Sequence, residues 1–264
     1  MTPPLLKHLH QDMLLMWDRN FLTYSHVQQV RSREAHLLAR IKKNQIFRPI
    51  QRLGDGSYLA KLYRNAGDRE HDRGGIPVRI IEYRFDDPKR PGAGEKHRLL
   101  TTLLDGRKHP AKTLVELYHG RWEEELAIDE LKTHESERPV LRSQTPAGVV
   151  QEIYGLMLGH YVLRTLMHEA AKKVPISPLR ISFVGTLKIL RCRLPECPQS
   201  PPARQRWWQN LLEEIAEEVI PERRNRINPR VIKRKMSNWL KKRPHHYHCP
   251  QPTKQFRRSV VVLR

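Results

Sequence analysis

A short apolar run near the start of the chain, residues 13–17 (MLLMW), constrains the fold most strongly. Five residues are too few for a buried helix, and an uninterrupted run of this length is typical of a strand that is covered on both faces. The polar residues 18–20 end it. A helix is predicted over 21–33 and a second strand over 36–42. A strand, a helix and a strand in this order indicate an α/β layer.

The next section, residues 44–109, has the character of a mostly antiparallel β-sheet. Gly54–Asp55–Gly56 is a hairpin-type turn. Strands are predicted over 78–85 and 97–104, with a Gly- and Pro-rich connection between them. Asp55 and Asp105 both lie in turns, where Asp is common for local reasons.

Helices dominate the rest of the chain. One long helix is predicted over 110–133. A second begins at Thr145, which is expected to be the N-cap, and runs to about residue 175. Its many apolar residues predict packing on more than one side. A third helix is predicted over 203–219.

The charge of the chain points to a polyanionic partner. Lys and Arg number 49 against 28 Asp and Glu, which gives a net charge of +21 and a pI near 10.3. A basic tail over 223–243 adds to this excess, and in such a chain the expected partner is nucleic acid.

Several classes of protein are disfavoured by composition. No stretch approaches the ~20 apolar residues that span a bilayer, and the N-terminus has no secretory pattern. A cytoplasmic protein that binds no membrane is therefore expected. The 3 cysteines argue against a disulfide framework. Zinc binding by Cys192 and Cys197 with the His/Cys cluster at 245–249 has loose ligand spacing, so free thiols are favoured.

The most informative segment is the predicted helix 110–133. At about 100° per residue, Tyr118, Arg121, Glu125 and Lys132 share one stripe about 60° wide. Such a row suits a phosphate backbone and a metal ion, because Glu supplies a hard oxygen ligand and Arg and Lys bind phosphate oxygens. Composition alone favours a solvated helix face over such a row.

The spacing Tyr-x2-Arg-x3-Glu-x6-Lys resembles the YREK signature of the DDE transposases of bacterial insertion sequences, in the insertion sequence 4 family. Residues 17–21 (WDRNF) resemble the Asp-Arg-x-Phe element of that family, which carries its second acidic residue. Residues 141–146 and 150–154 are similar to the segment after its catalytic helix. The likeness extends from about residue 5 to 240.

The resemblance implies an α/β, ribonuclease H-like fold with a mixed sheet, a β-rich insertion and a helical, basic C-terminal region. Residues 1–43 are expected to be part of the core and 44–109 the insertion. Residues 110–175 are expected to supply the catalytic helix and a packing helix, and 176–264 the basic region.

The resemblance also implies metal-dependent phosphoryl transfer at transposon ends. Asp18 and Glu125 would be catalytic metal ligands, with two Mg²⁺ ions expected in the intact family site. Tyr118 and Arg121 would contact the phosphate of the transferred end, and Lys132 the DNA backbone.

One departure from the family concerns the first catalytic Asp, which in the family lies on the opening strand, well before the Asp-Arg-x-Phe element. Only seventeen residues precede Asp18, and Asp12 is too close to lie on a separate strand. The chain is therefore expected to be the C-terminal part of a transposase that is inactive alone. Missing central strands would leave the strand at 13–17 with an unpaired edge.

The function expected from the resemblance is that of a DDE-type DNA transposase, in a truncated copy, with transposon ends and target DNA as partners. Assembly with a second copy or with an intact transposase fits this expectation. The alternative is a catalytically dead DNA-binding or transposase-interacting fragment. An RNA-binding protein is disfavoured, because the aromatic-rich motifs of the common modules are absent.

Overall fold

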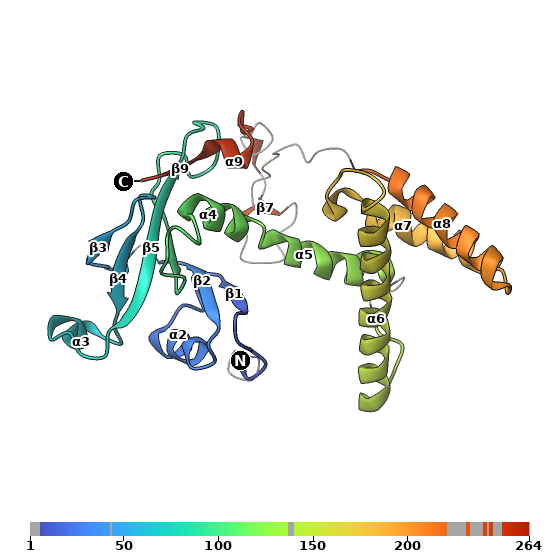
Figure 1. The fold of residues 1–264 in the computed structure, drawn as a ribbon. Helices are drawn as coiled ribbons and strands as arrows, with labels where there is room; N and C mark the ends of the chain where they lie inside the picture. Colours follow the sequence, from blue (N-terminus) through green and yellow to red (C-terminus); the bar gives the residue numbers. More distant parts are fainter. Residues whose placement is uncertain are drawn as a thin grey trace. The chain divides into compact units, whose positions relative to one another are not determined.

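The protein is represented by a computed structural model that describes residues 6–42, 44–136, 140–220, 231–232, 240–241, 243–244 and 250–263. It divides into two compact units (Figure 1). Unit 1 comprises residues 1–121 and 225–264, and unit 2 comprises residues 122–224.

Unit 1 contains the sheet. Its strands are β1 (Leu14–Trp17), β2 (His36–Arg40), β3 (Gln51–Arg52), β4 (Tyr58–Leu62), β5 (Ile76–Phe85), β6 (His97–Thr101), β7 (Val231–Ile232), β8 (Leu240–Lys241) and β9 (Val260–Val262). Its helices are α2 (Tyr24–Arg31), α3 (Ala66–Glu70), α4 (Ala111–His119) and α9 (Phe256–Ser259).

The main sheet is mixed. Its strand order is β1-β2-β6-β5-β4-β3, and β9 also pairs with β5. β1 and β2 are parallel, whereas the other neighbours in this sheet are antiparallel. β7 and β8 form a separate parallel pair. The predicted α/β class with a mixed sheet is confirmed.

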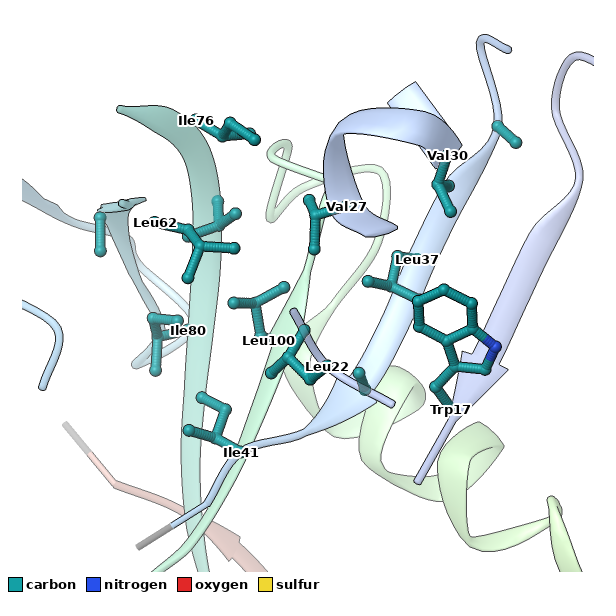
Figure 2. Packing of buried hydrophobic residues seen from close by; sticks show 14 of the residues in the cluster. Trp17, Leu22, Val27, Val30, Leu37, Ile41, Leu62, Ile76, Ile80 and Leu100 are labelled. Carbon is teal, nitrogen blue, oxygen red and sulfur yellow. The ribbon is translucent and has the colours of Figure 1, made fainter. Parts of the chain in front are cut away.

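Two buried clusters cover opposite faces of this sheet. The cluster with α2 includes Val27, Val30, Leu37, Ile80 and Leu100 (Figure 2). The cluster with α4 includes Leu38, Ile81, Leu99, Leu114 and Val115. Neighbouring residues of one strand, such as Leu37 and Leu38, thus enter different clusters, because successive side chains in a strand point to opposite faces. Burial on both faces explains why these strands are almost continuously apolar.

The β-rich section joins the sheet of β1 and β2. β2 pairs antiparallel with β6, with Leu38 opposite Thr101. The segment 44–109, which the sequence predicts as an insertion, therefore continues the sheet that begins at residue 14. The two compact units meet at residues 121/122 and 224/225. The domain boundaries predicted at 43, 109 and 175 stay predictions.

β1 lies at one end of the sheet. Within the described ranges it pairs with β2 alone, so its outer edge is open, as the sequence predicts. Unpaired N–H and C=O groups on such an edge can accept another strand.

The prediction of one helix over 110–133 is wrong. α4 ends at His119, and α5 begins only at Trp122 (Trp122–Asp129). Between them the Arg121 N–H bonds to the Tyr118 carbonyl at 3.2 Å, a three-residue turn that tightens the chain. From Glu130 to Glu135 the chain is a π-helix, η1. A uniform 100° per residue therefore does not relate the four side chains of the predicted stripe.

Unit 2 is helical. Besides α5 and η1 it contains α6 (Pro146–Ala171), the 3₁₀ turn η2 (Pro178–Arg180), α7 (Phe183–Arg193), the 3₁₀ turn η3 (Leu194–Glu196) and α8 (Pro201–Glu217). The helices predicted to begin at Thr145 and to cover 203–219 are thus confirmed as α6 and α8. The basic tail predicted over 223–243 lies largely outside the described residues.

The packing predicted for α6 is correct only for its C-terminal half. Leu163, Leu166 and Met167 are buried with α7 and α8. The preceding turns expose Tyr154 and Tyr161, which are 63% and 69% accessible. The prediction that this helix packs on more than one side is therefore wrong for its first half, since apolar composition by itself does not show that a partner surface is present.

The described part of the chain has no helix that is both long and apolar enough to span a membrane. Cys192 and Cys197 carry free thiols. The His/Cys cluster at 245–249, on which the zinc alternative depends, lies outside the described residues.

The start of α6 gives a test of the helix cap. The Thr145 hydroxyl accepts a hydrogen bond from the Gly148 N–H at 3.2 Å. Thr145→Ala should lower the free energy of unfolding by about 1 kcal/mol, because it frees that N–H. Denaturant unfolding of the full chain measures this. Ser200→Ala is the matched control, because Ser200 occupies the N-cap of α8 without making a side-chain cap bond. Equal losses in the two variants would contradict the role given to Thr145.

Candidate catalytic site at the end of strand β1

Asp18 stands directly after β1, where the chain leaves the sheet. Its carbonyl accepts the Phe21 N–H at 3.1 Å, which closes the turn. Its Oδ1 accepts the Arg19 N–H at 2.7 Å. The side chain is half-buried, and Oδ2 has no hydrogen-bond partner among the described residues. One oxygen of the carboxylate is therefore fixed and the other is available to a ligand.

Trp17 anchors this turn to the core. Its side chain is buried in the cluster beneath α2 (Figure 2). The ring lies 5.3 Å from that of His26 and 6.5 Å from that of Phe21, between centroids. Asp18 thus follows a residue with little freedom to move.

Tyr118 and Arg121 meet this turn from α4 and the residues after it. The Tyr118 hydroxyl donates to the Trp17 carbonyl at 3.0 Å. The guanidinium carbon of Arg121 is 6.0 Å from the centre of the Tyr118 ring. Burial raises the pKa of Tyr118. The charge of Arg121 opposes that shift, whereas the charge of Asp18 adds to it. The structure therefore brings together three of the predicted site residues.

Glu125 and Lys132 belong to unit 2. Glu125 lies in α5 and Lys132 in η1, and both are exposed. The segment that carries these two residues is held to α6 through Glu130. Oε2 of Glu130 lies 3.0 Å from Nε2 of His160 and 2.6 Å from the guanidinium of Arg164, both on α6. The proximity of Glu125 to Asp18 stays a prediction.

The side chains around Asp18 supply only some of the ligands that a hard divalent cation needs. A carboxylate oxygen such as Asp18 Oδ2 is the ligand type that Mg²⁺ prefers. Among the described residues, however, no three His, Cys, Asp or Glu side chains gather as a metal site. Asp12 cannot join Asp18, because β1 lies between them and its four residues alone extend over roughly 13 Å at about 3.3 Å per residue. Further ligands must therefore come from beyond this turn.

The interpretation of Asp55 as a purely local turn residue is wrong. Its carboxylate forms an ion pair with Arg79, which is fully buried in β5. It also accepts the Ala111 N–H at 2.8 Å, at the first residue of α4. Pro110, at the N-cap of α4, makes no side-chain cap bond, so Asp55 takes its place. Asp105, by contrast, does bind local N–H groups, those of Arg107 and Lys108.

Arg79 has a partner for each part of its guanidinium. Besides the ion pair, it donates to the Ser57 hydroxyl at 2.8 Å and to the His109 carbonyl at 2.7 Å. Burial opposes the ionised form of Asp55, but the hydrogen bonds from Ser57 and Ala111 and the charge of Arg79 lower its pKa overall. The only sequence signal for this network was a charged residue inside the apolar run of β5.

The mixed sheet with helices on both faces, and an acidic residue at the end of the parallel strand β1, agree with a ribonuclease H-like core. A family model described as "Transposase DDE domain" matches residues 1–162. The chain belongs to the DDE transposase family, as the signature around Glu125 predicts.

A curated relative agrees with the insertion sequence 4 family. The protein named "Transposase InsG for insertion sequence element IS4", from Escherichia coli (strain K12), is 28% identical over 204 residues. The similarity covers 75% of this chain but 45% of the relative, so the chain spans less than half the length of the protein it matches.

Proposed function

We propose that this chain supplies part of the active site of a DDE-type DNA transposase, which carries out phosphoryl transfer at transposon ends. The observation that carries the proposal is the arrangement at the end of β1. There Asp18 keeps one carboxylate oxygen available, beside Tyr118 and Arg121 of the family signature. The match to the transposase family over residues 1–162 supports it.

The family generally uses a divalent metal, and we propose Mg²⁺ because carboxylate oxygens are its preferred protein ligands. Asp18 and Glu125 would hold it. When bound, the metal would lower the pKa of the attacking hydroxyl and stabilise charge on the leaving oxygen. The residues of the chain position the DNA: Arg121 and Lys132 would bind phosphate oxygens through charge-assisted hydrogen bonds.

A third carboxylate would complete the site. We propose that it arrives on a strand that pairs with the open edge of β1, from a segment outside these 264 residues. That segment either precedes them in a longer chain or belongs to a second chain, such as an intact transposase. Either source would place an acidic side chain beside Asp18, because adjacent strands lie about 4.8 Å apart.

A cleavage assay on DNA carrying the cognate transposon ends tests this function. Residues 1–264 alone should give no Mg²⁺-dependent nicking. The same residues, joined to the part of the E. coli relative that lies outside the matched region, should nick the ends when Mg²⁺ is added. Robust cleavage by 1–264 alone would contradict the need for a third carboxylate. Metal-independent cleavage by the joined chain would contradict the DDE mechanism.

The second candidate, a catalytically dead fragment that binds DNA or an intact transposase, shares the open edge of β1 and the net charge of +21. It predicts DNA binding in the same samples but no cleavage by the joined chain. Either function places the protein with DNA, and we propose the bacterial cytoplasm and its nucleoid as the location.

A further inference from the structure

We propose that Tyr118 is a positioning residue, whose hydroxyl holds the Trp17 carbonyl and thereby fixes the place of the Asp18 carboxylate. The inference rests on the proposed function, because it assigns Tyr118 a task at the same site. It differs from the role implied by the family resemblance, in which this tyrosine contacts the phosphate of the DNA end.

The hydrogen bond joins two residues that are far apart in the sequence. Tyr118 and Trp17 are 101 positions apart, and the bond is 3.0 Å long. Trp17 is the last residue of β1, and its carbonyl belongs to the peptide group that leads into Asp18. A constraint on that carbonyl is a constraint on the backbone of Asp18, since the peptide group is planar.

The surroundings make the tyrosine a rigid donor. Its ring packs against the cluster beneath α4, as do Leu14 and Met16 of β1. Leu114 and Val115, one turn earlier on α4, are buried in the same cluster. The helix and the strand are therefore already in contact, and the hydroxyl adds a directional bond at the point where the strand ends.

Tyr118 and Arg121 are suited to different tasks at this site. A tyrosine has a single O–H to donate, and here the Trp17 carbonyl accepts it. It cannot donate to a phosphate at the same time. Arg121 lies beside Tyr118 and carries a permanent positive charge, which attracts phosphate oxygens whether or not the tyrosine donates to them. Arg121 is thus suited to bind phosphate while Tyr118 holds the strand end.

The test compares Tyr118→Phe with a matched control. Tyr24→Phe removes a bond of the same type in the same unit, because the Tyr24 hydroxyl donates to the Gly74 carbonyl at 2.6 Å. In the full chain, Tyr118→Phe should speed hydrogen exchange of the Arg19 and Phe21 amides by about fivefold, whereas Tyr24→Phe should not change it. 3-Fluorotyrosine at position 118 retains the hydroxyl and should restore protection.

A second measurement separates the two roles. Fluorescence anisotropy with a short DNA duplex should show the affinity of Tyr118→Phe within about twofold of the wild type, whereas Arg121→Ala weakens it at least about tenfold. Unchanged exchange at residues 19–21, or a loss of DNA affinity equal to that of Arg121→Ala, would overturn the inference. Neither readout requires cleavage, so failure of the transposase assay leaves this test valid. Thermal melting of each variant confirms that it is folded.

Discussion

Asp55→Asn is expected to lower the free energy of unfolding by about 3–5 kcal/mol, the usual effect of removing one partner from a buried ion pair. Arg79 is fully buried, so the substitution leaves its charge without a counter-charge in the core. It also weakens the acceptor of the Ala111 N–H at the start of α4. Denaturant unfolding of the full chain, followed by circular dichroism, measures the change.

Two variants distinguish the ion pair from a general effect of losing a turn aspartate. Asp105→Asn should lower the free energy of unfolding by only about 1 kcal/mol, because Asp105 accepts local N–H groups. Arg79→Met in the Asp55→Asn background should recover part of the loss, since it removes the uncompensated charge. If Asp55→Asn and Asp105→Asn have equal effects, the ion pair does not stabilise the fold as argued.

The same pair predicts how stability depends on pH. Because folding lowers the pKa of Asp55, its stabilisation is complete above the unfolded value of about 3.9 and is lost as the pH falls through the folded value. Unfolding experiments between pH 5 and 2 should therefore show a smaller acid-induced loss for the variant with Asn at 55 than for the wild type. Equal pH profiles would contradict this assignment.

Local patterns predicted the elements whose causes lie within a few residues. The apolar run at 13–17 predicted β1, and Thr145 before Pro146 predicted the start of α6. The break at Gly120 was missed, because one glycine lowers helix propensity by only about 1 kcal/mol and the apolar pattern continues past it. The YREK spacing identified the family but not the helix geometry around it.

Long-range contacts account for the remainder. Asp55 and Arg79 are 24 residues apart, and Trp17 and Tyr118 are 101 apart. Nothing within a short window of sequence records which strand end a given side chain will meet. The charged residue in the apolar run of β5 signalled that a partner was needed but not which residue would supply it. The pairing of β4 with β5 brings Asp55 near Arg79, and the packing of α4 brings Tyr118 to the end of β1.

Asp18→Asn and Glu125→Gln are each expected to lower Mg²⁺-dependent cleavage by the joined chain at least about 10³-fold, equivalent to about 4 kcal/mol in the activation barrier. Each substitution keeps the shape of the side chain and removes the negative charge that holds a cation. DNA affinity should change little, because neither carboxylate attracts the phosphate backbone. Gel-based cleavage and fluorescence anisotropy on the same samples measure the two effects.

Glu124→Gln is the matched control for Glu125, since Glu124 is an exposed carboxylate at the preceding position of α5. It should retain cleavage within about twofold, because a carboxylate that binds no metal does not stabilise the transition state. Asp12→Asn serves the same purpose for Asp18, at the opposite end of β1. Equal losses in Glu124→Gln and Glu125→Gln would show that α5 needs its total charge and not one ligand. Full activity in Asp18→Asn would remove the strand end from the catalytic site, and with it the reason for Tyr118 to hold the Trp17 carbonyl.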